Sequence, residues 1–436
     1  MEIRDPVHGS IHILDEEIPI IRDDFFQRLR NIKQLGFSEY VFPGATHTRF
    51  IHSIGVMNIA SSAFDRLFKA KLQDKDFQRL KETFKLACLL HDVGHAPLSH
   101  STEIVMPMLS ELNIPKDFLS AKDQKTDRQA THEDYTIKSI VDSSFSGSFS
   151  LVEKKFGLQR KHIADLIVGH TSDPAYFTIE GVNYFPILTQ LVSSELDCDR
   201  MDYLLRDSYF CGVSYGSYDL DWMLDNLELC IDNGHAYLGI NERAVVTFDD
   251  FLLSRYHMFI QVYFHYRAVC LEQLLYKYFR TSPTEYVIPA SIEAYIEHDD
   301  QHLMKILRRS KNPYAEAVVK NQVPQKIFES FNEKQEVQLS VIQDYLAAEN
   351  IEFIRSSSSG RLSKYYVDET SISKYPMKVV RKLFGSNERI VFDIGEATDL
   401  FTKFAKSHAV NRLHCDYEKL SPAQQKNILE LIRSGK

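Results

Sequence analysis

An apolar run that ends in a histidine–aspartate doublet constrains the fold of this chain more than any other feature. Residues 84–90 read Phe-Lys-Leu-Ala-Cys-Leu-Leu, and His91 and Asp92 follow directly. Such a run predicts a helix that faces the core, and a pair of metal-binding side chains rarely stands at the end of a core helix by chance. The segment therefore predicts a metal site at a helix end, and an enzyme is the leading interpretation.

Two further side chains complete a set of four candidate ligands. His52 follows Arg49 by three residues, so a helical turn would place both on one face. Asp199 comes much later in the chain. Two imidazoles and two carboxylates suit a divalent ion of borderline hardness, and they leave coordination positions open for water and substrate. Iron, manganese, cobalt, zinc and magnesium are all compatible with this set.

A structural role for the doublet is the competing interpretation, because a buried histidine more often satisfies a core hydrogen bond than it binds a metal. The surroundings weigh against it. Gly94 lets the backbone crowd the site, and His95 and His100 follow closely. A structural role would have to provide burial partners for several histidines and carboxylates around one apolar helix. We therefore favour the metal site.

Longer motifs resemble those of the HD-domain dNTP triphosphohydrolases, both the bacterial members and the catalytic core of the vertebrate SAM-and-HD-domain enzyme. The matching blocks are residues 26–36, 41–50, 52–56, 91–100, 199–203 and 206–208. The resemblance implies metal-dependent hydrolysis of a deoxynucleoside triphosphate to a deoxynucleoside and inorganic triphosphate. It also implies that the metal ligands are His52, His91, Asp92 and Asp199.

The family's positions around the reacting phosphate carry groups that can move a proton. The candidate catalytic residues are His95, His100, Glu103, His132 and Glu133. Either His100 or His132 could hold and pass a proton near neutral pH, and the resemblance does not decide which is the general acid. Glu103 stands where the vertebrate enzyme has aspartate, so its reach differs.

The resemblance also implies the substrate contacts. Phosphate would be bound by Arg49, by Arg200 in place of a family lysine, and by Arg255 at the terminal phosphate, because guanidinium groups match phosphate oxygens. The sugar contacts would be Gln34, Tyr203 and Asp207 at the 3′-hydroxyl, with Leu35 and Tyr263 against the ring. Phe259 and Tyr266 replace a histidine and a lysine of the vertebrate enzyme, so some phosphate contacts are missing or come from elsewhere.

A nucleotide effector is a further expectation, although its binding mode would differ. Gln27 and Arg30 match contacts to an activating guanine nucleotide in the vertebrate enzyme, but Arg22 stands where an acidic residue reads the guanine edge. A guanidinium cannot accept those hydrogen bonds, so a different nucleotide or no activator fits. The family also implies a homo-oligomer, either a dimer or a tetramer.

Hydrophobic periodicity predicts a mainly α fold. The predicted helices cover residues 25–36, 51–71, 76–91, 132–142, 160–170, 187–207, 220–229 and 247–280. Turn residues predict a short hairpin over residues 5–13, and the charged segment 116–131 predicts an exposed loop. With the resemblance, these elements give an HD-domain helical core over residues 1–285.

The pattern changes after residue 285, and we expect a smaller C-terminal α+β lobe over residues 286–436, with a regulatory or oligomerisation role. Residues 291–309 predict a helix, and residues 362–367 and 389–394 resemble strands. Four serines and a glycine at 356–360 predict a flexible connection.

Composition agrees with a globular protein of 436 residues, with 44% hydrophobic and 25% charged residues. The net charge of -9 argues against strong nucleic-acid binding, which needs a basic surface. Six cysteines without a regular spacing, and no stretch typical of a leader or a membrane span, predict a cytoplasmic protein.

Two other classes of function remain open. One is another HD phosphohydrolase, acting on a nucleoside monophosphate, a cyclic dinucleotide or an alarmone, which would share the metal ligands without needing Gln34, Leu35 and Tyr203 together. The other is a nucleotide sensor without catalysis. The presence of all four ligand candidates and several proton-transfer groups favours an enzyme.

Overall fold

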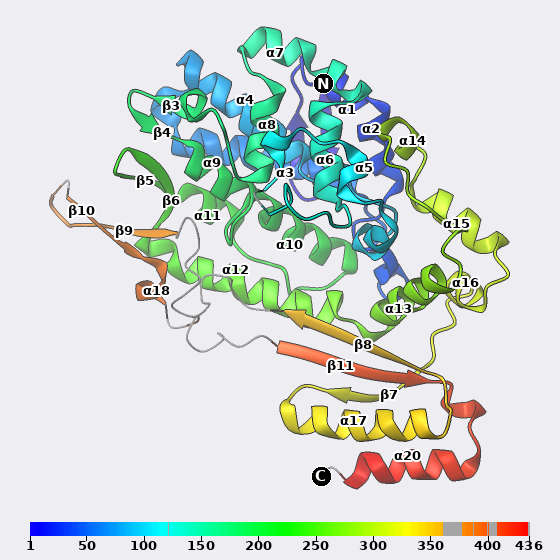
Figure 1. The fold of residues 1–436 in the computed structure, drawn as a ribbon. Coiled ribbons are helices and arrows are strands. Elements are labelled where there is room, and N and C mark those ends of the chain that lie inside the picture. Colours follow the sequence, from blue (N-terminus) through cyan, green and yellow to red (C-terminus); the bar gives the residue numbers. More distant parts are fainter. Residues whose placement is uncertain (121, 361–376, 387, 399, 401–407, 435–436) are drawn as a thin grey trace.

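Helices make up most of the fold, as Figure 1 shows, so the predicted mainly α class is confirmed. The computed structural model describes residues 1–120, 122–360, 377–386, 388–398, 400 and 408–434. None of the helices in this described part combines the length and the hydrophobicity that a membrane span requires.

Three helices form the centre of the core. Helix α3 (Arg49–Leu67) packs against both α4 (Lys75–Leu90) and α10 (Cys198–Cys211). The apolar run explains this position, because every residue of α4 from Phe84 to Leu90 is buried. The helix begins where the Asp74 side chain accepts hydrogen bonds from two free backbone N–H groups. It ends at His91, so the doublet lies at a helix end as expected.

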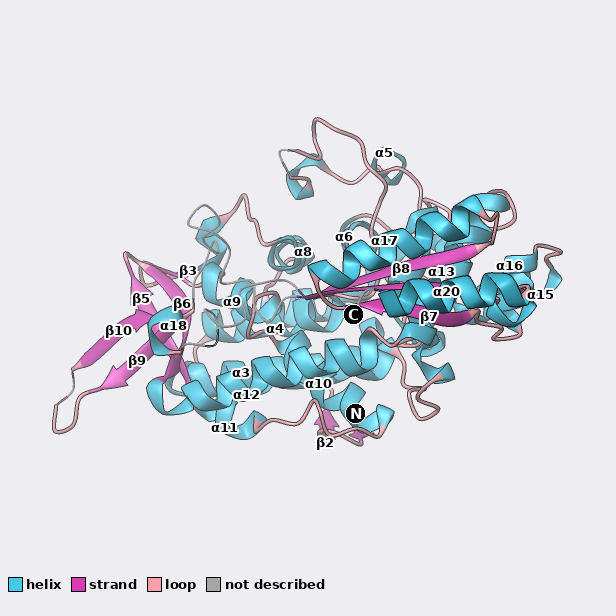
Figure 2. Ribbon diagram, turned by 90° about the horizontal axis from the view of Figure 1, so that it is seen from below, coloured by secondary structure: helices cyan, strands magenta, loops and turns pink. Residues whose placement is uncertain are grey.

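Other helices surround this centre. Helices α6 (His132–Val141), α8 (Arg160–Val168) and α9 (Phe185–Val192) lie on the α4 side, and α12 (Val245–Met258) and α13 (Tyr266–Thr281) run along the opposite side (Figures 1 and 2). Further helices are α1 (Ile18–Arg22), α2 (Asp24–Gln27), α5 (Leu109–Leu112), α7 (Ser150–Phe156), α11 (Leu220–Asp225), α14 (Ile292–Tyr295), α15 (Asp300–Arg309), α16 (Pro313–Val319) and α18 (Ile394–Ala397).

Two small sheets flank the helical core. The predicted hairpin is present as β1 (Glu2–Asp5) paired antiparallel with β2 (Gly9–His12). In the second sheet, β6 (His235–Asn241) pairs in parallel with β4 (Val182–Asn183) and β9 (Lys378–Lys382), and antiparallel with β5 (Leu227–Asp232). Strands β3 (Thr178–Ile179) and β10 (Arg389–Asp393) extend its two ends. In Figure 1, β9 and β10 project from the side of the molecule.

A separate layer near the C-terminus has its own hydrophobic cluster. Strands β7 (Gln325–Ser330), β11 (His408–Cys415) and β8 (Phe353–Gly360) form its sheet in that spatial order. Helices α17 (Glu333–Ala348) and α20 (Pro422–Ser434) lie side by side against this sheet (Figure 2). The cluster joins Leu339 and Ile342 of α17 to Leu413 of β11 and Ile428 of α20.

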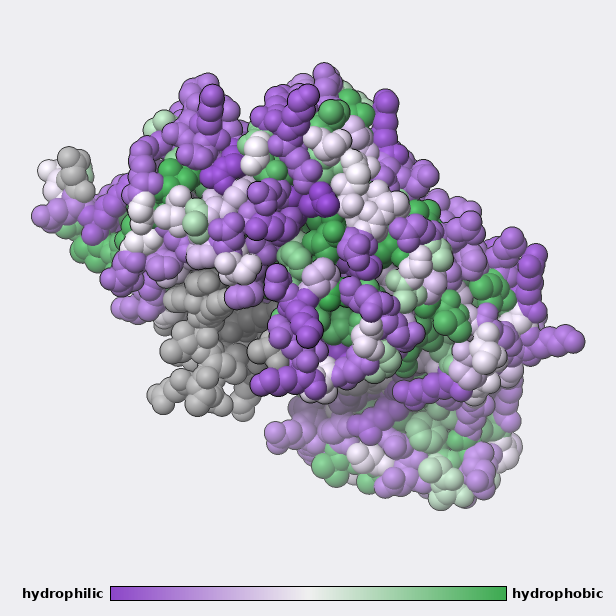
Figure 3. All heavy atoms as spheres, turned by 45° about the horizontal axis from the view of Figure 1, so that its top comes forward, coloured by the Kyte–Doolittle hydropathy of each residue, from purple (hydrophilic) through white to green (hydrophobic). Residues whose placement is uncertain are grey.

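Helices α14, α15 and α16, which precede β7, still contribute side chains to the main hydrophobic core. Strand β9, which follows β8 in the chain, also belongs with the helical core, because it pairs with β6. The predicted division at residue 285 stays a prediction. Figure 3 shows a mainly hydrophilic face with hydrophobic side chains in scattered patches.

Several predicted elements were wrong. The helix predicted over residues 25–36 ends early, because α2 passes into a 3-10 turn at Arg28–Asn31 and Lys33 then pairs with Thr48 in a β-bridge. The helix predicted over residues 187–207 is two helices, since Asp197 caps α10 and starts it anew. The helix predicted over residues 220–229 stops at Asp225, and β5 follows.

Two further corrections concern the second half of the chain. The helix predicted over residues 247–280 is interrupted by a turn of π-helix at Phe259–Tyr263, and α13 begins after His265 caps it. The predicted flexible connection at 356–360 is the end of β8, because pairing with β11 outweighs the weak strand propensity of serine. The strand predicted over residues 389–394 corresponds to β10, and the one over 362–367 lies outside the described residues.

Candidate metal centre

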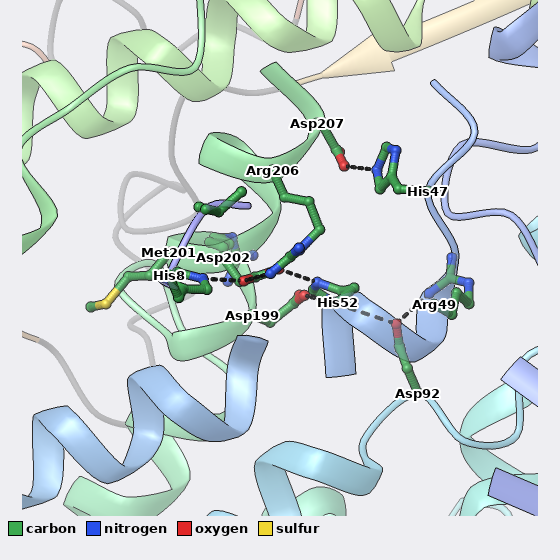
Figure 4. Close-up of polar contacts among 12 residues, drawn as sticks. His8, His47, Arg49, His52, Asp92, Asp199, Met201, Asp202, Arg206 and Asp207 are labelled. Carbon is green, nitrogen blue, oxygen red and sulfur yellow. Dashed lines mark hydrogen bonds and ion pairs between the residues drawn. The ribbon is translucent and has the colours of Figure 1, made fainter. Parts of the chain in front are cut away.

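Three helices bring the four predicted metal ligands together, as Figure 4 shows for three of them. His52 lies on α3, His91 and Asp92 follow α4, and Asp199 lies in the first turn of α10. The His52 Nε2 atom is 3.0 Å from Asp199 Oδ1 and 3.8 Å from Asp92 Oδ2. The His91 Nε2 atom is 3.5 Å from both Asp199 Oδ1 and Asp92 Oδ1.

The two imidazoles present unused nitrogen atoms to this space. Both Nε2 atoms are buried and have no hydrogen-bond partner. The other nitrogen of each ring is engaged, since His91 Nδ1 lies 2.8 Å from the Cys88 carbonyl oxygen and His52 Nδ1 lies 2.8 Å from Asp202 Oδ2. These contacts fix the rings so that their Nε2 lone pairs face the carboxylates, which is the arrangement that a metal site needs. His52, His91 and Asp199 can therefore hold a divalent metal ion.

Electrostatics in the cluster reflect its paired charges. Burial opposes a charge on His52, but the neighbouring Asp199 and Asp202 carboxylates raise its pKa to about 9. Burial likewise opposes a charge on His91, but the Asp92 carboxylate raises its pKa to about 10. Without a cation, the imidazoles take up protons that balance the carboxylates. A divalent ion would supply the same charge and release those protons.

Arg49 lies beside Asp92 at the edge of the cluster. Its Nη1 donates to Asp92 Oδ2, and its Nε and Nη2 donate to the Ser99 hydroxyl at 3.1 and 2.9 Å. Ser99 and the preceding Leu98 both have left-handed backbone conformations, with φ of 60° and 55°. Asp300 holds this turn, because its Oδ1 accepts from the Leu98 backbone N–H at 2.7 Å. Local strain of this kind persists only where surrounding contacts enforce it.

A second group of side chains lies next to the first. His132 Nδ1 is 2.5 Å from Glu103 Oε1, His100 Nδ1 is 3.2 Å from the same oxygen, and the His95 ring stacks on His132 with centroids 3.8 Å apart. Gly94 permits this approach, because a Cβ there would lie 2.2 Å from the His132 carbonyl oxygen.

The same group could offer metal ligands by distance alone. The His95 and His132 rings are within 12° of parallel, however, so their in-plane lone pairs do not converge on one point. Burial opposes the charge of Glu103, but hydrogen bonds to His100 and His132 hold its pKa well below the usual range. The group therefore suits proton transfer better than a second metal.

Most of the predicted site residues line one cavity of about 330 Å³. Those at its wall are Gln34, Arg49, His91, Asp92, His95, His100, His132, Glu133, Asp199, Arg200 and Tyr203. Arg200 is close to Asp197, to which its Nη1 donates. Glu133 is exposed at the start of α6.

Four predicted substrate contacts do not reach this cavity: Leu35, Asp207, Arg255 and Tyr263. Asp207 is occupied by protein, because its Oδ1 lies 2.7 Å from His47 Nε2 and its Oδ2 accepts from the Tyr263 hydroxyl at 2.7 Å. Arg255 donates to Glu195 Oε2 at 2.9 Å. The structure thus brings the predicted metal ligands together with Arg49 and Arg200, but it separates Arg255 and part of the predicted sugar pocket from them.

Sequence reasoning missed the residues behind His52. Asp202, Arg206 and His8 form a buried network that ends on the His52 ring (Figure 4). Asp5 extends this network, because it accepts from Arg206. The only local signal was the spacing of Asp199, Asp202 and Arg206, which places them near one face of a helix. Nothing in the hairpin sequence pointed to a contact with α10, about 200 residues away.

Comparison with known proteins identifies the class. Residues 49–174 match the HD domain, a segment that contains His52, His91 and Asp92. An uncharacterized protein of Bacillus subtilis is 34% identical over 264 residues, which cover 60% of this chain and 51% of that protein. A solved structure of a hypothetical protein from Aquifex aeolicus has the same fold, with a TM-score of 0.72, 24% identity, and coverage of 98% of this chain and 99% of that one.

Residues 49–174 of this chain therefore form an HD domain. A Dictyostelium discoideum protein named deoxynucleoside triphosphate triphosphohydrolase SAMHD1 homolog is 32% identical over 216 residues, 49% of this chain and 37% of that protein. The predicted resemblance to the HD-domain dNTP triphosphohydrolase family is confirmed by these matches. The chain spans about half the length, or less, of these two curated relatives.

Proposed function

We propose that this chain is a metal-dependent phosphohydrolase that cleaves deoxynucleoside triphosphates to a deoxynucleoside and inorganic triphosphate. One observation carries the proposal. Two buried histidine Nε2 atoms without hydrogen-bond partners face two carboxylates, directly beside Arg49 and the hydrogen-bonded pair His132 and Glu103. Metal, phosphate-binding and proton-transfer groups thus share one small cavity, which is the set that hydrolysis of a phosphate ester requires.

The residues divide the work by their chemistry. A divalent cation held by the four ligands would lower the pKa of a bound water and offset phosphate charge. Arg49 and Arg200 line the cavity and bind phosphate oxygens in exchange for their present carboxylate partners, Asp92 and Asp197. Gln34 and Tyr203 line the same cavity and contact the sugar.

Proton transfer falls to the imidazoles around Glu103. The ionised Glu103 carboxylate accepts from His132 Nδ1–H and stabilises the imidazolium form of that ring, which can give its Nε2 proton to the leaving oxygen and return to the neutral Nδ1–H form. His100 contacts the same carboxylate and is more exposed, so it can exchange protons with water. His95 stays neutral, because burial and the nearby Arg49 charge hold its pKa well below the usual range.

A second candidate substrate class is a nucleoside monophosphate. The cavity measures about 330 Å³, and Asp207, Tyr263 and Arg255 are bonded to protein groups outside its wall. A shorter phosphate ester would need only the metal, Arg49 and the groups near Glu103. A nucleotide effector, a homo-oligomer and a cytoplasmic location stay predictions; Arg30, expected at the effector site, is bonded to Gln27 and stacks on Phe50.

The test is direct. The purified chain is loaded with Mn²⁺ and given each dNTP and rNTP, singly and mixed, and dAMP, with chromatographic separation of products. We expect intact inorganic triphosphate from dNTPs, and loss of turnover in His91→Ala, Asp92→Ala and Asp199→Ala. His162→Ala is the matched control, because His162 is a buried histidine paired with Asp165 outside this cluster.

The products distinguish the alternatives. Release of inorganic phosphate from dAMP, with no reaction of dNTPs, would select the monophosphate candidate. Binding of nucleotides without any turnover would refute catalysis and select a sensor. Unchanged turnover in the three ligand variants would refute the metal assignment.

A further inference from the structure

A buried carboxylate stands directly behind the metal ligand His52. Asp202 is fully buried on α10, and each of its oxygens lies within hydrogen-bond distance of two nitrogen atoms. Oδ2 accepts from Arg206 Nε at 2.7 Å and lies 2.8 Å from His52 Nδ1. Oδ1 accepts from Arg206 Nη2 at 2.8 Å and lies 2.5 Å from His8 Nε2. All four positions around this carboxylate are therefore filled.

The network continues to the N-terminal hairpin. The remaining donors of Arg206 reach Asp5, with Nη1 at 2.8 Å from Oδ2 and Nη2 at 3.3 Å from Oδ1. Asp5 ends β1, and His8 lies in the turn before β2. Asp5 Oδ1 also accepts from the His8 backbone N–H at 2.9 Å, so Asp5 fixes the turn that carries His8. Two residues of the hairpin thus hold the carboxylate that contacts the metal ligand.

The helices are built to admit this network. Gly55 lies one turn after His52 on α3 and faces α10. A Cβ atom at Gly55 would lie 2.1 Å from Asp202 Oδ1 and 2.3 Å from Arg206 Nη2. The absence of a side chain at position 55 is what lets the carboxylate reach His52 Nδ1.

The hydrogen bonds determine the state of the His52 ring. An ionised carboxylate can only accept, so His52 must carry its proton on Nδ1, and the lone pair of Nε2 then faces Asp199 and the cation site. Without Asp202, the ring could place that proton on Nε2 or turn about its side-chain torsions, and either change removes a ligand. Arg206 balances the charge of Asp202, which lets the carboxylate remain buried.

We propose that Asp202 is a positioning residue of the metal centre, and that His8 and Arg206 hold it in place, so that the N-terminal hairpin is part of the metal centre. The proposal rests on the metal site described above and does not depend on which phosphate ester is the substrate. The competing explanation is that the network only ties the hairpin to α10 and contributes stability alone. The two explanations differ in what happens to metal affinity.

Metal affinity is measured by titrating the full chain, after treatment with chelator, with Mn²⁺ and following free Mn²⁺ by electron paramagnetic resonance. In Asp202→Asn, an amide NH2 donor replaces one of the two accepting oxygens. That donor then points at the N–H of either His52 or His8 and cannot accept its hydrogen bond. We expect the Mn²⁺ dissociation constant to rise about 10- to 100-fold, as for other residues that orient metal ligands. His8→Ala should raise it by a smaller factor, and His8→Gln, which keeps a donor, should restore it.

A matched control separates stability from metal binding. Asp165 is a buried aspartate whose Oδ2 lies 3.1 Å from His162 Nδ1, the same kind of pair away from the cation site. Asp165→Asn should lower the melting temperature of the metal-free protein and leave the Mn²⁺ dissociation constant unchanged. Thermal unfolding of each metal-free variant establishes that it is folded before titration.

The outcomes are decisive in both directions. If folded Asp202→Asn binds Mn²⁺ as the wild type does, the proposal is overturned. If that variant does not fold, the His8 pair decides, and wild-type affinity in His8→Ala overturns the proposal. Wild-type protein that binds Mn²⁺ but cleaves no nucleotide would refute the proposed function and leave this inference standing.

Discussion

Replacing Gly55 with alanine tests whether the α3–α10 contact is as close as the structure indicates. In an exposed helix, alanine in place of glycine stabilises by about 1 kcal/mol. At position 55 the new Cβ would lie 2.1 Å from Asp202 Oδ1 and 2.3 Å from Arg206 Nη2, far inside van der Waals contact. Both atoms belong to a buried ion pair packed on all sides, so neither is a flexible end that can move away.

The magnitude follows from the two possible responses. If the helices separate, overpacking costs about 1–3 kcal/mol. If the Asp202–Arg206 pair breaks instead, an uncompensated buried charge costs about 3–5 kcal/mol. After the helix-propensity gain of about 1 kcal/mol is subtracted, the first response leaves a net loss of up to about 2 kcal/mol in the free energy of unfolding, and the second leaves a net loss of about 2–4 kcal/mol. The steric term therefore decides the sign.

The assay is urea denaturation followed by circular dichroism, with metal-free protein. Gly395→Ala is the control, because Gly395 lies in α18 and a Cβ there meets no atom within 4 Å. We expect Gly395→Ala to be neutral or stabilising and Gly55→Ala to be destabilising. Equal stability of Gly55→Ala and the wild type would refute the argument that the carboxylate network fills the space beside α3.

Three further predictions concern protons and catalysis. Because the pKa values of His52 and His91 are about 9 and 10, Mn²⁺ binding at pH 7.5 should release close to two protons per ion; calorimetry in buffers of different ionisation enthalpy would contradict this if it found none. Glu103→Gln should lower turnover about 100-fold or more without changing Mn²⁺ affinity, and a matching loss of affinity would instead place Glu103 in the metal shell. Burial raises the pKa of Asp300 to about 6, above its unfolded value, so its stabilising contribution is complete at low pH and is lost as pH rises through 6. The free energy of unfolding of the wild type relative to Asp300→Asn should therefore fall by about 2 kcal/mol from pH 4 to 7, and a pH-independent difference would count against the shift.

The parts of the fold that depend on neighbours in sequence were predictable. The apolar run before His91 gave α4 and the position of the doublet, and the spacing of Arg49 and His52 placed both on one face of α3. The predictions failed where a helix is interrupted within an apolar pattern that continues. The break between α9 and α10 depends on Asp197 bonding to the Arg200 backbone, a local choice that apolar periodicity does not detect.

Long-range pairing was beyond the reach of the sequence. Strand β5 reads as a continuation of α11, and its strand conformation comes from pairing with β6. Asp202 is similar, because its role depends on contacts from His8 and Arg206 that no spacing reveals. For the predicted sugar contacts, the residue types could be read from the sequence, but not the hydrogen bond that the Tyr263 hydroxyl donates to Asp207.

The route of the chain after β8 limits how this protein can be divided. It leaves the C-terminal sheet, adds β9 and β10 beside β6 of the helical core, and returns as β11 between β7 and β8. A version truncated after α16 would strip β6 of its partner at residues 239–241 and expose backbone groups that invite pairing with another molecule. Deleting the C-terminal layer would thus promote aggregation rather than release an independent catalytic fragment.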